Sequence, residues 1–167
     1  MKLNGFPNST ENNSRLTSVI TDAYNCLAHA LFNDSRWIWP DTKGKGAWPP
    51  DMKREETLEC VTEFLMRIGF QPCGDHLLDD GWLKIAIYTS FEIPTHFARQ
   101  TPSGKWSSKM GDKIDIEHDD LWVLGKASYG NPTHFMKIPT AKTIVIPELH
   151  PPAPILVNLQ GGALRVT

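Results

Sequence analysis

From residue 70 onward the hydrophobic period of this chain changes to two, and this pattern restricts the fold more than any other feature. The segment 82–89 is rich in β-branched and aromatic residues, which favour strands. Two further strands are predicted at 95–100 and 105–109, because segments rich in Pro, Gly and Ser precede and separate them. The pattern therefore predicts an antiparallel meander of three or more strands.

Helical patterns lie mainly in the first half of the chain. Residues 54–68 place Leu58, Val61, Phe64 and other apolar side chains on one face, so a helix is predicted there. A second, buried helix is predicted at 22–32, because Asp22 is a good N-cap and mostly apolar or small residues follow it. A short helix at 121–124 and strands at 133–138 and 143–146 complete the prediction, whereas residues 111–118 are expected to be irregular.

The chain is long enough for one domain with its own core, at 167 residues. Its first 14 residues are rich in Asn, Ser and Thr and are expected to form a flexible arm. A single domain is predicted over 15–146, and a Pro-rich extended tail over 147–167.

Composition limits the partners of the protein. The net charge of −2 gives no basic surface for nucleic acid or anionic membranes. No apolar run is long enough for a membrane span, and no signal-peptide core is found near the N-terminus. Three cysteines without paired spacing suit a reducing compartment. We therefore expect a cytoplasmic protein, or one exported without a cleaved signal peptide.

One cysteine and one histidine have the placement that thiol chemistry needs. Cys26 lies in the first turns of the predicted helix at 22–32, where the helix dipole favours a thiolate. His96 opens the predicted strand at 95–100, and a cysteine with a histidine on a later strand is the minimal thiol nucleophile pair. The alternative is a structural role, because cysteine is among the residues most often buried.

Three tryptophans, Trp37, Trp39 and Trp48, lie within twelve positions and are interrupted by prolines. This spacing is incompatible with a regular helix and predicts a loop that packs over the first helix. Two interpretations remain open for the indole rings: they either anchor the loop in the core or line a substrate groove.

The order of these elements is that of the α+β, papain-like cysteine hydrolases, and the compact chain resembles their NlpC-type branch. Several blocks also resemble a bacterial domain family of uncharacterised function that is itself similar to NlpC-type hydrolases. These blocks are YNCLAHA (24–30), RWIWP (36–40), REETL (54–58), THFARQ (95–100), GKWSSKMG (104–111) and DIEH (115–118). The resemblance covers about residues 16–138 and implies a Cys-bearing N-terminal helix packed on an antiparallel sheet.

The resemblance also implies roles for individual residues. Cys26 would be the nucleophile and His96 the base. In the mechanism that we expect from these two residues, backbone N–H groups at the start of the helix hold the oxyanion together with Asn25. The group that orients His96 would lie near Ser107 or Ser108, with Lys109 adjacent, while Asp115 is chemically the best partner for an imidazole N–H. His118 is a further candidate at this position.

The predicted function is hydrolysis or acyl transfer at an amide or peptide bond of a small or protein substrate, without a cofactor. The alternative is a non-catalytic binding module, such as one of a toxin and immunity pair. A zinc site at Cys26 and His29 with His96 or His118 is less favoured, because no second pair of ligands with metal-site spacing follows. The sequence does not determine the oligomeric state.

Overall fold

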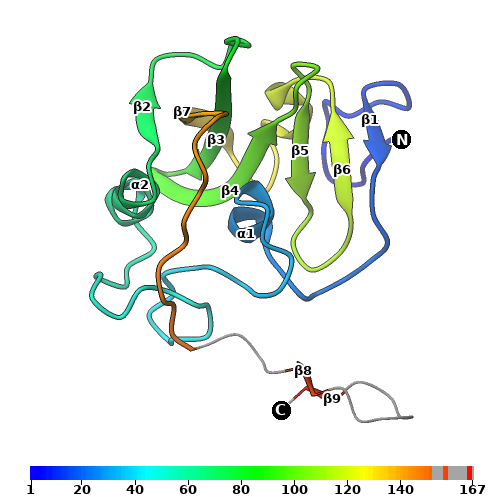
Figure 1. Ribbon diagram of the computed structural model, residues 1–167. Helices are drawn as coiled ribbons and strands as arrows, with labels where there is room; N and C mark the ends of the chain where they lie inside the picture. The colour runs from blue at the N-terminus through cyan, green and yellow to red at the C-terminus, as the bar shows by residue number, and fades with distance from the viewer. Residues whose placement is uncertain (152–155, 158–164, 167) are drawn as a thin grey trace.

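The computed structural model describes residues 1–151, 156–157 and 165–166. Its centre is a seven-stranded sheet with the strand order β1-β6-β5-β4-β3-β7-β2 (Figure 1). In that order the strands are Ser14–Leu16, Asp115–His118, Trp106–Lys109, Ile93–Gln100, Trp82–Ser90, Asn131–Pro139 and Gln71–Cys73. All neighbouring strands are antiparallel. Two short strands, β8 (Leu156–Val157) and β9 (Arg165–Val166), pair with each other.

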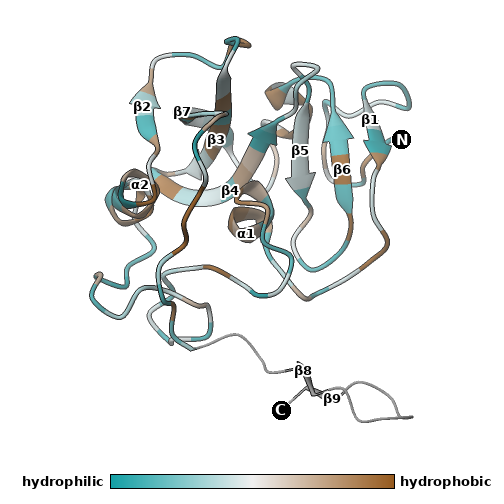
Figure 2. Ribbon diagram, in the orientation of Figure 1, coloured by the Kyte–Doolittle hydropathy of each residue, from teal (hydrophilic) through white to brown (hydrophobic). Residues whose placement is uncertain are grey.

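Each face of the sheet is covered by a different group of elements. Helices α1 (Cys26–Ala30) and α2 (Leu58–Arg67) share one core with Phe97. The 3₁₀ helix η1 (Leu121–Leu124) and the N-terminal residues cover the other face, where Tyr88 and Trp106 are buried. Figure 2 shows hydrophobic residues concentrated on α1 and α2 and along the central strands. Since β4 contributes to both cores, successive side chains of this strand serve opposite faces.

The expected papain-like α+β fold is wrong. The described part of the chain is mostly an antiparallel sheet with only two short α-helices, and 13% of it is helical. The helix predicted at 22–32 is reduced to five residues and is capped by Asn25 instead of Asp22. The preceding backbone bonds instead to the turn between β5 and β6, since Thr21 N–H donates to the Lys113 carbonyl. At the other end, Phe32 follows the helix with a φ of 59°.

Other local predictions agree better with the structure. The predicted strands at 82–89, 95–100, 105–109 and 133–138 form as β3, β4, β5 and β7, and the helix predicted at 54–68 forms as α2. η1 matches the short helix expected at 121–124. The strand expected at 143–146 is absent from this described segment, and the segment 111–118 contains β6 instead of irregular structure.

The N-terminal 14 residues lie against the sheet. The Met1 ammonium donates to the carbonyls of Glu11 and Ser14, each at 2.6 Å, and Leu3 is buried. At the other end Leu149 is buried and His150 pairs with Trp48 through two backbone hydrogen bonds. The remainder of the predicted tail lies largely outside the described residues. Within the described part of the chain, every helix is too short or too polar to cross a bilayer.

Candidate functional site

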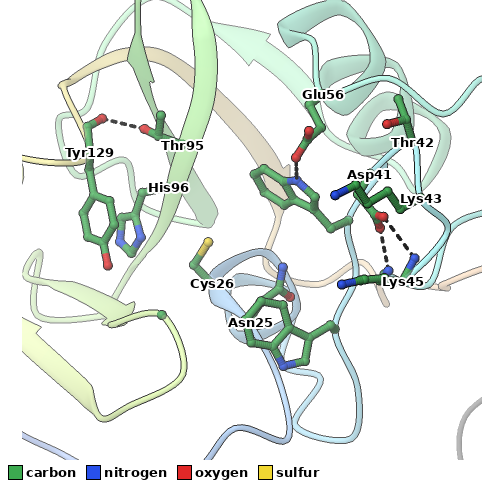
Figure 3. Close-up of a pocket in the computed structure, with 14 residues that line it drawn as sticks. Asn25, Cys26, Asp41, Thr42, Lys43, Lys45, Glu56, Thr95, His96 and Tyr129 are labelled. Atoms are coloured by element: carbon green, nitrogen blue, oxygen red, sulfur yellow. Dashed lines mark hydrogen bonds between the residues drawn. The ribbon is translucent and has the colours of Figure 1, made fainter.

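A pocket of about 710 Å³ opens where the start of α1 meets the tryptophan loop and the start of β4. Its walls include Asn25, Cys26, Trp37, Trp39, His96 and Tyr129, together with the turn at 41–46. Figure 3 shows the Cys26 sulfur between the His96 and Tyr129 rings on one side and the Asp41 turn on the other. The pocket therefore contains a thiol and an imidazole that come from different layers of the fold.

Asn25 fixes the wall that carries Cys26. Its side-chain oxygen accepts hydrogen bonds from the backbone N–H of Ala28, at 3.2 Å, and of Ile38, at 3.0 Å. Its amide nitrogen donates to the Ile38 carbonyl at 2.9 Å. One buried side chain thus caps α1 and attaches the tryptophan loop to it. The geometry assigns Asn25 a positioning role beside the cysteine.

A buried chain of hydrogen bonds runs from the pocket along the face of the sheet that η1 covers. His96 Nε2 lies 3.0 Å from Ser108 Oγ, and Ser108 Oγ lies 2.9 Å from His118 Nε2. His118 Nδ1 lies 2.8 Å from the backbone carbonyl of Asp120. His96, Ser108 and His118 are each at most 1% exposed. Ser108 and His118, both singled out in the sequence, are therefore brought together with His96.

This chain determines which nitrogen of His96 carries a proton. The Asp120 carbonyl can only accept, so His118 Nδ1 is the donor and its Nε2 is an acceptor. Ser108 then donates to His118, and its oxygen accepts from His96 Nε2–H. His96 Nδ1 is left as an unprotonated nitrogen, and it is buried without a hydrogen-bond partner among the described residues. The tautomer therefore offers a free base at the pocket wall.

Burial keeps both reactive groups neutral at rest. It raises the pKa of the Cys26 thiol to about 11, although backbone groups of Phe97 and Leu27 act in the opposite direction. Burial also lowers the pKa of His96 well below its ordinary value, and the nearby His118 and His29 lower it further. A thiol and a neutral imidazole face the pocket instead of a thiolate and imidazolium pair.

The tryptophans divide between the two roles that the sequence left open. Trp37 and Trp39 line the pocket, and their indole N–H groups donate to the Asp22 carbonyl and to Glu56. Trp48 does not line it, because its fully buried ring packs 4.6 Å from the Phe64 ring. Trp48 is therefore a core residue.

Two predicted site residues belong to a different network, on the α1 side of the sheet. Asp115 Oδ2 accepts from Tyr24 OH at 2.7 Å and lies 3.5 Å from His29 Nδ1. Lys109 is fully buried and donates to the carbonyls of Thr21 and Lys113, both at 2.6 Å. Asp115 thus does not orient His96, and neither residue lines the pocket.

Replacing Asp115 with Asn should reduce stability and leave the pocket chemistry unchanged. The substitution removes the charge that accepts from Tyr24 and lies near Lys109 and His29, so we expect a loss of about 2 kcal/mol in the free energy of unfolding. Urea denaturation measures the effect, with Asp112→Asn as a control in an exposed turn. A stable Asp115→Asn protein whose Cys26 had lost reactivity would instead place Asp115 in the site.

Pocket residues that the sequence analysis missed are Tyr129 and the turn at 41–46. Tyr129 stacks on His96 with ring centroids 4.1 Å apart, and the Asp41 carboxylate accepts from the backbone N–H of Lys45 and Gly46 at 3.0 and 2.6 Å. No local signal marks Tyr129, because its position depends on how the chain returns from η1 to β7. Within the residues described, no cluster of three or more His, Cys, Asp or Glu could hold a metal ion.

Comparison with curated proteins and with solved structures gives no match. One uncharacterised family does match, and nothing in that match links the chain to NlpC-type hydrolases, so this part of the expected resemblance has no support. The match extends over residues 15–137, from β1 into β7, and includes both Cys26 and His96. The chain therefore belongs to the family described as Domain of unknown function (DUF7689).

Proposed function

We propose that the pocket is the site of a thiol-dependent hydrolase or acyl-transfer reaction on an amide or peptide bond. Cys26 is the nucleophile and His96 the general base. The observation that carries the proposal is the unpartnered, unprotonated Nδ1 of a buried histidine in the same pocket as a cysteine thiol. A histidine held in this tautomer by a buried serine suits proton abstraction.

The first step follows from the neutral resting state. His96 Nδ1 takes the proton of Cys26 as the sulfur attacks the carbonyl carbon, because the raised pKa of the thiol leaves little free thiolate. Backbone groups of Cys26 and Leu27 already lower the pKa of the thiol and are candidate donors to the oxyanion. His96 then returns its proton to the leaving amine, and water or another acceptor cleaves the thioester.

The outer part of the pocket suits a peptide or amide substrate. The indole N–H groups of Trp37 and Trp39 are occupied by protein acceptors, so their ring faces remain for apolar contact. Lys43 and Lys45 lie on the opposite turn and are exposed. Apolar walls with a few polar groups are typical of sites that bind organic ligands.

The pH dependence of Cys26 acylation tests the proposed mechanism. We would measure acyl transfer from p-nitrophenyl acetate to Cys26 by intact mass spectrometry, in a protein with Cys60→Ser and Cys73→Ser. General-base catalysis by His96 predicts a rate constant that is nearly flat from pH 8 to below 6.5, because the pKa of His96 is lowered. The rate should fall only in more acidic solution, where His96 becomes protonated.

A matched variant separates catalysis from simple thiol reactivity. His96→Gln should slow acylation by about 100-fold or more, the usual contribution of a positioned base. Its remaining rate should rise tenfold for each pH unit, as free thiolate becomes available. Two results would contradict the proposal. One is a wild-type acylation rate that also rises tenfold for each pH unit over the whole range, and the other is a rate that His96→Gln does not change.

The second candidate function is a non-catalytic binding module. The observation that favours it is the shielding of Cys26, which is 8% exposed and has its pKa raised to about 11, whereas reactive cysteines usually have lowered pKa values. In that case the pocket would bind a partner through its tryptophans, and the acylation profile would be that of an unassisted thiol.

We further propose that the protein works in a reducing compartment such as the cytoplasm. All three cysteines are free, and Cys26 must remain a thiol for the chemistry above. Oxidation or alkylation of Cys26 would remove the proposed nucleophile.

A further inference from the structure

A second pocket, of about 720 Å³, lies at the C-terminal end of α1. Its apolar walls include Leu31, Phe32, Leu83, Ile138, Ile144 and Ile146. Arg99 of β4 also lines it and brings a positive charge into these apolar surroundings. The walls come from residues 31–33 after α1, from β3, β4 and β7, and from the segment after β7.

The Arg99 guanidinium is held in a fixed place by two contacts. Its Nη1 donates to the backbone carbonyl of His29. The Phe32 ring lies 3.7 Å from the guanidinium carbon on its other side. Phe32 reaches this position through its left-handed backbone, with a φ of 59°, a conformation that is uncommon for a bulky residue. A neutral carbonyl and an aromatic ring orient the cation without neutralising it.

No carboxylate of the described residues forms an ion pair with Arg99. The acidic group that acts on it, Asp115, contacts His29 and Lys109 instead. Residues 151–167 contain neither Asp nor Glu, so no acidic side chain of that segment could complete the pair. Burial lowers the pKa of Arg99 to about 10, as expected for a desolvated cation without an anionic partner. Arg99 is partly buried, and charges that are removed from water are normally paired.

We propose that this second pocket binds a small apolar molecule bearing a carboxylate, with Arg99 pairing with the carboxylate and the isoleucines contacting the apolar part. Arginine is suited to this, because its planar guanidinium can hold a carboxylate through two parallel hydrogen bonds. The pocket volume is in the range of small-molecule sites. The inference goes beyond the proposed thiol chemistry and does not depend on it.

Calorimetric titration of the full chain tests the proposal with two pairs of probes. Octanoate and octanamide represent an aliphatic acid and its neutral counterpart. N-acetyl-leucyl-leucine and its amide represent an apolar peptide C-terminus and its neutral counterpart. We expect at least one acid to bind about tenfold or more tightly than its amide, since a charge-assisted hydrogen bond is lost in the amide. The acid that binds identifies the source of the ligand.

Variants locate the binding to this pocket. Arg99→Met should abolish the preference for the acid, whereas Arg67→Met, on the exposed face of α2, should retain it. If Arg99→Met does not fold, Ile144→Asp places a negative charge in the same pocket and should weaken acid binding by about tenfold. The proposal is overturned if neither acid binds, if acids and amides bind equally, or if the folded variants bind like the wild type.

Discussion

Lowering the pH from 7 to 5 should reduce the free energy of unfolding by about 4 kcal/mol or more. The cause is a group of three buried histidines, His29, His96 and His118. Burial lowers the pKa values of His29 and His118 from 6.5 to about 4, and it lowers that of His96 well below 6.5. The unfolded chain therefore binds protons at pH 5 that the folded protein does not, which stabilises the unfolded state.

The pH window follows from the same values. Above about pH 6.5 the histidines are neutral in both states and stability changes little with their protonation. Between pH 6.5 and about 4, His29 and His118 are charged only in the unfolded chain, so stability falls as the pH decreases. These two histidines each contribute about 2 kcal/mol by pH 5, and His96, whose pKa is also lowered, acts in the same direction. Below about pH 4 the folded protein also takes up the protons of His29 and His118, and the contribution of these two becomes constant.

Urea denaturation at a series of pH values measures this effect. The slope of the free energy of unfolding against pH gives the difference in bound protons. His118→Gln should reduce that slope by about one proton, and Asn12→Gln, an exposed change that involves no titratable group, should leave it unchanged. Because the slope is compared, the result does not depend on how much either variant destabilises the protein. A wild-type stability that is constant between pH 7 and 5 would contradict the assignment of neutral buried histidines.

Replacing Ser108 with Ala should slow acylation of Cys26 by about 100-fold, whereas the same change at Ser107 should not slow it. The two serines are neighbours on β5 and both bind a histidine. Ser108 Oγ joins His96 to His118, while Ser107 Oγ lies 2.8 Å from His29 Nε2 on the opposite face. Without Ser108, nothing fixes the proton on Nε2 of His96, and the tautomer with a free Nδ1 is no longer enforced.

The comparison separates catalytic positioning from stability. Both variants leave histidine nitrogens without a partner, so each should lose about 2 kcal/mol or more in the free energy of unfolding. Their acylation rates should nevertheless differ, and Ser108→Thr, which restores a hydroxyl, should recover part of the rate. Equal rates in Ser107→Ala and Ser108→Ala would show that the hydrogen-bonded chain does not support the base.

The elements that could be predicted from the sequence are those whose own side chains determine them. The apolar stripe of α2 and the strand-forming residues of β3 gave the correct element types. The fold class could not be obtained in this way, because α1 is five residues long and depends on contacts with the sheet. A helix this short is unstable alone, so its length is not encoded in its local pattern. β6 contains only four residues and was missed for the same reason.

The sequence predicted several residues of the candidate site, but not which of them are hydrogen-bonded to one another. Cys26 and His96 were singled out by their chemistry, whereas the partner of His96 depends on strand register. Ala98 pairs with Ser108, and Ser108 pairs with Ile116. Side chains two residues from a paired position share its face, which brings His96, Ser108 and His118 together and sends Asp115 to the other side. Sequence chemistry favoured Asp115, but the register determines the neighbour.

The Asn25 side chain forms two hydrogen bonds with the backbone of Ile38, and these have a consequence for how the pocket selects ligands. Ile38 bridges to Ala47 in the same loop, and Trp39 is bonded to Glu56 just before α2. The wall opposite His96 is therefore attached at several points, to α1 through Asn25 and to the segment before α2 through Glu56. Opening it would break several buried hydrogen bonds at once. A molecule that enters this pocket must match a cavity that already exists, so discrimination between ligands rests on shape and not on closure around them.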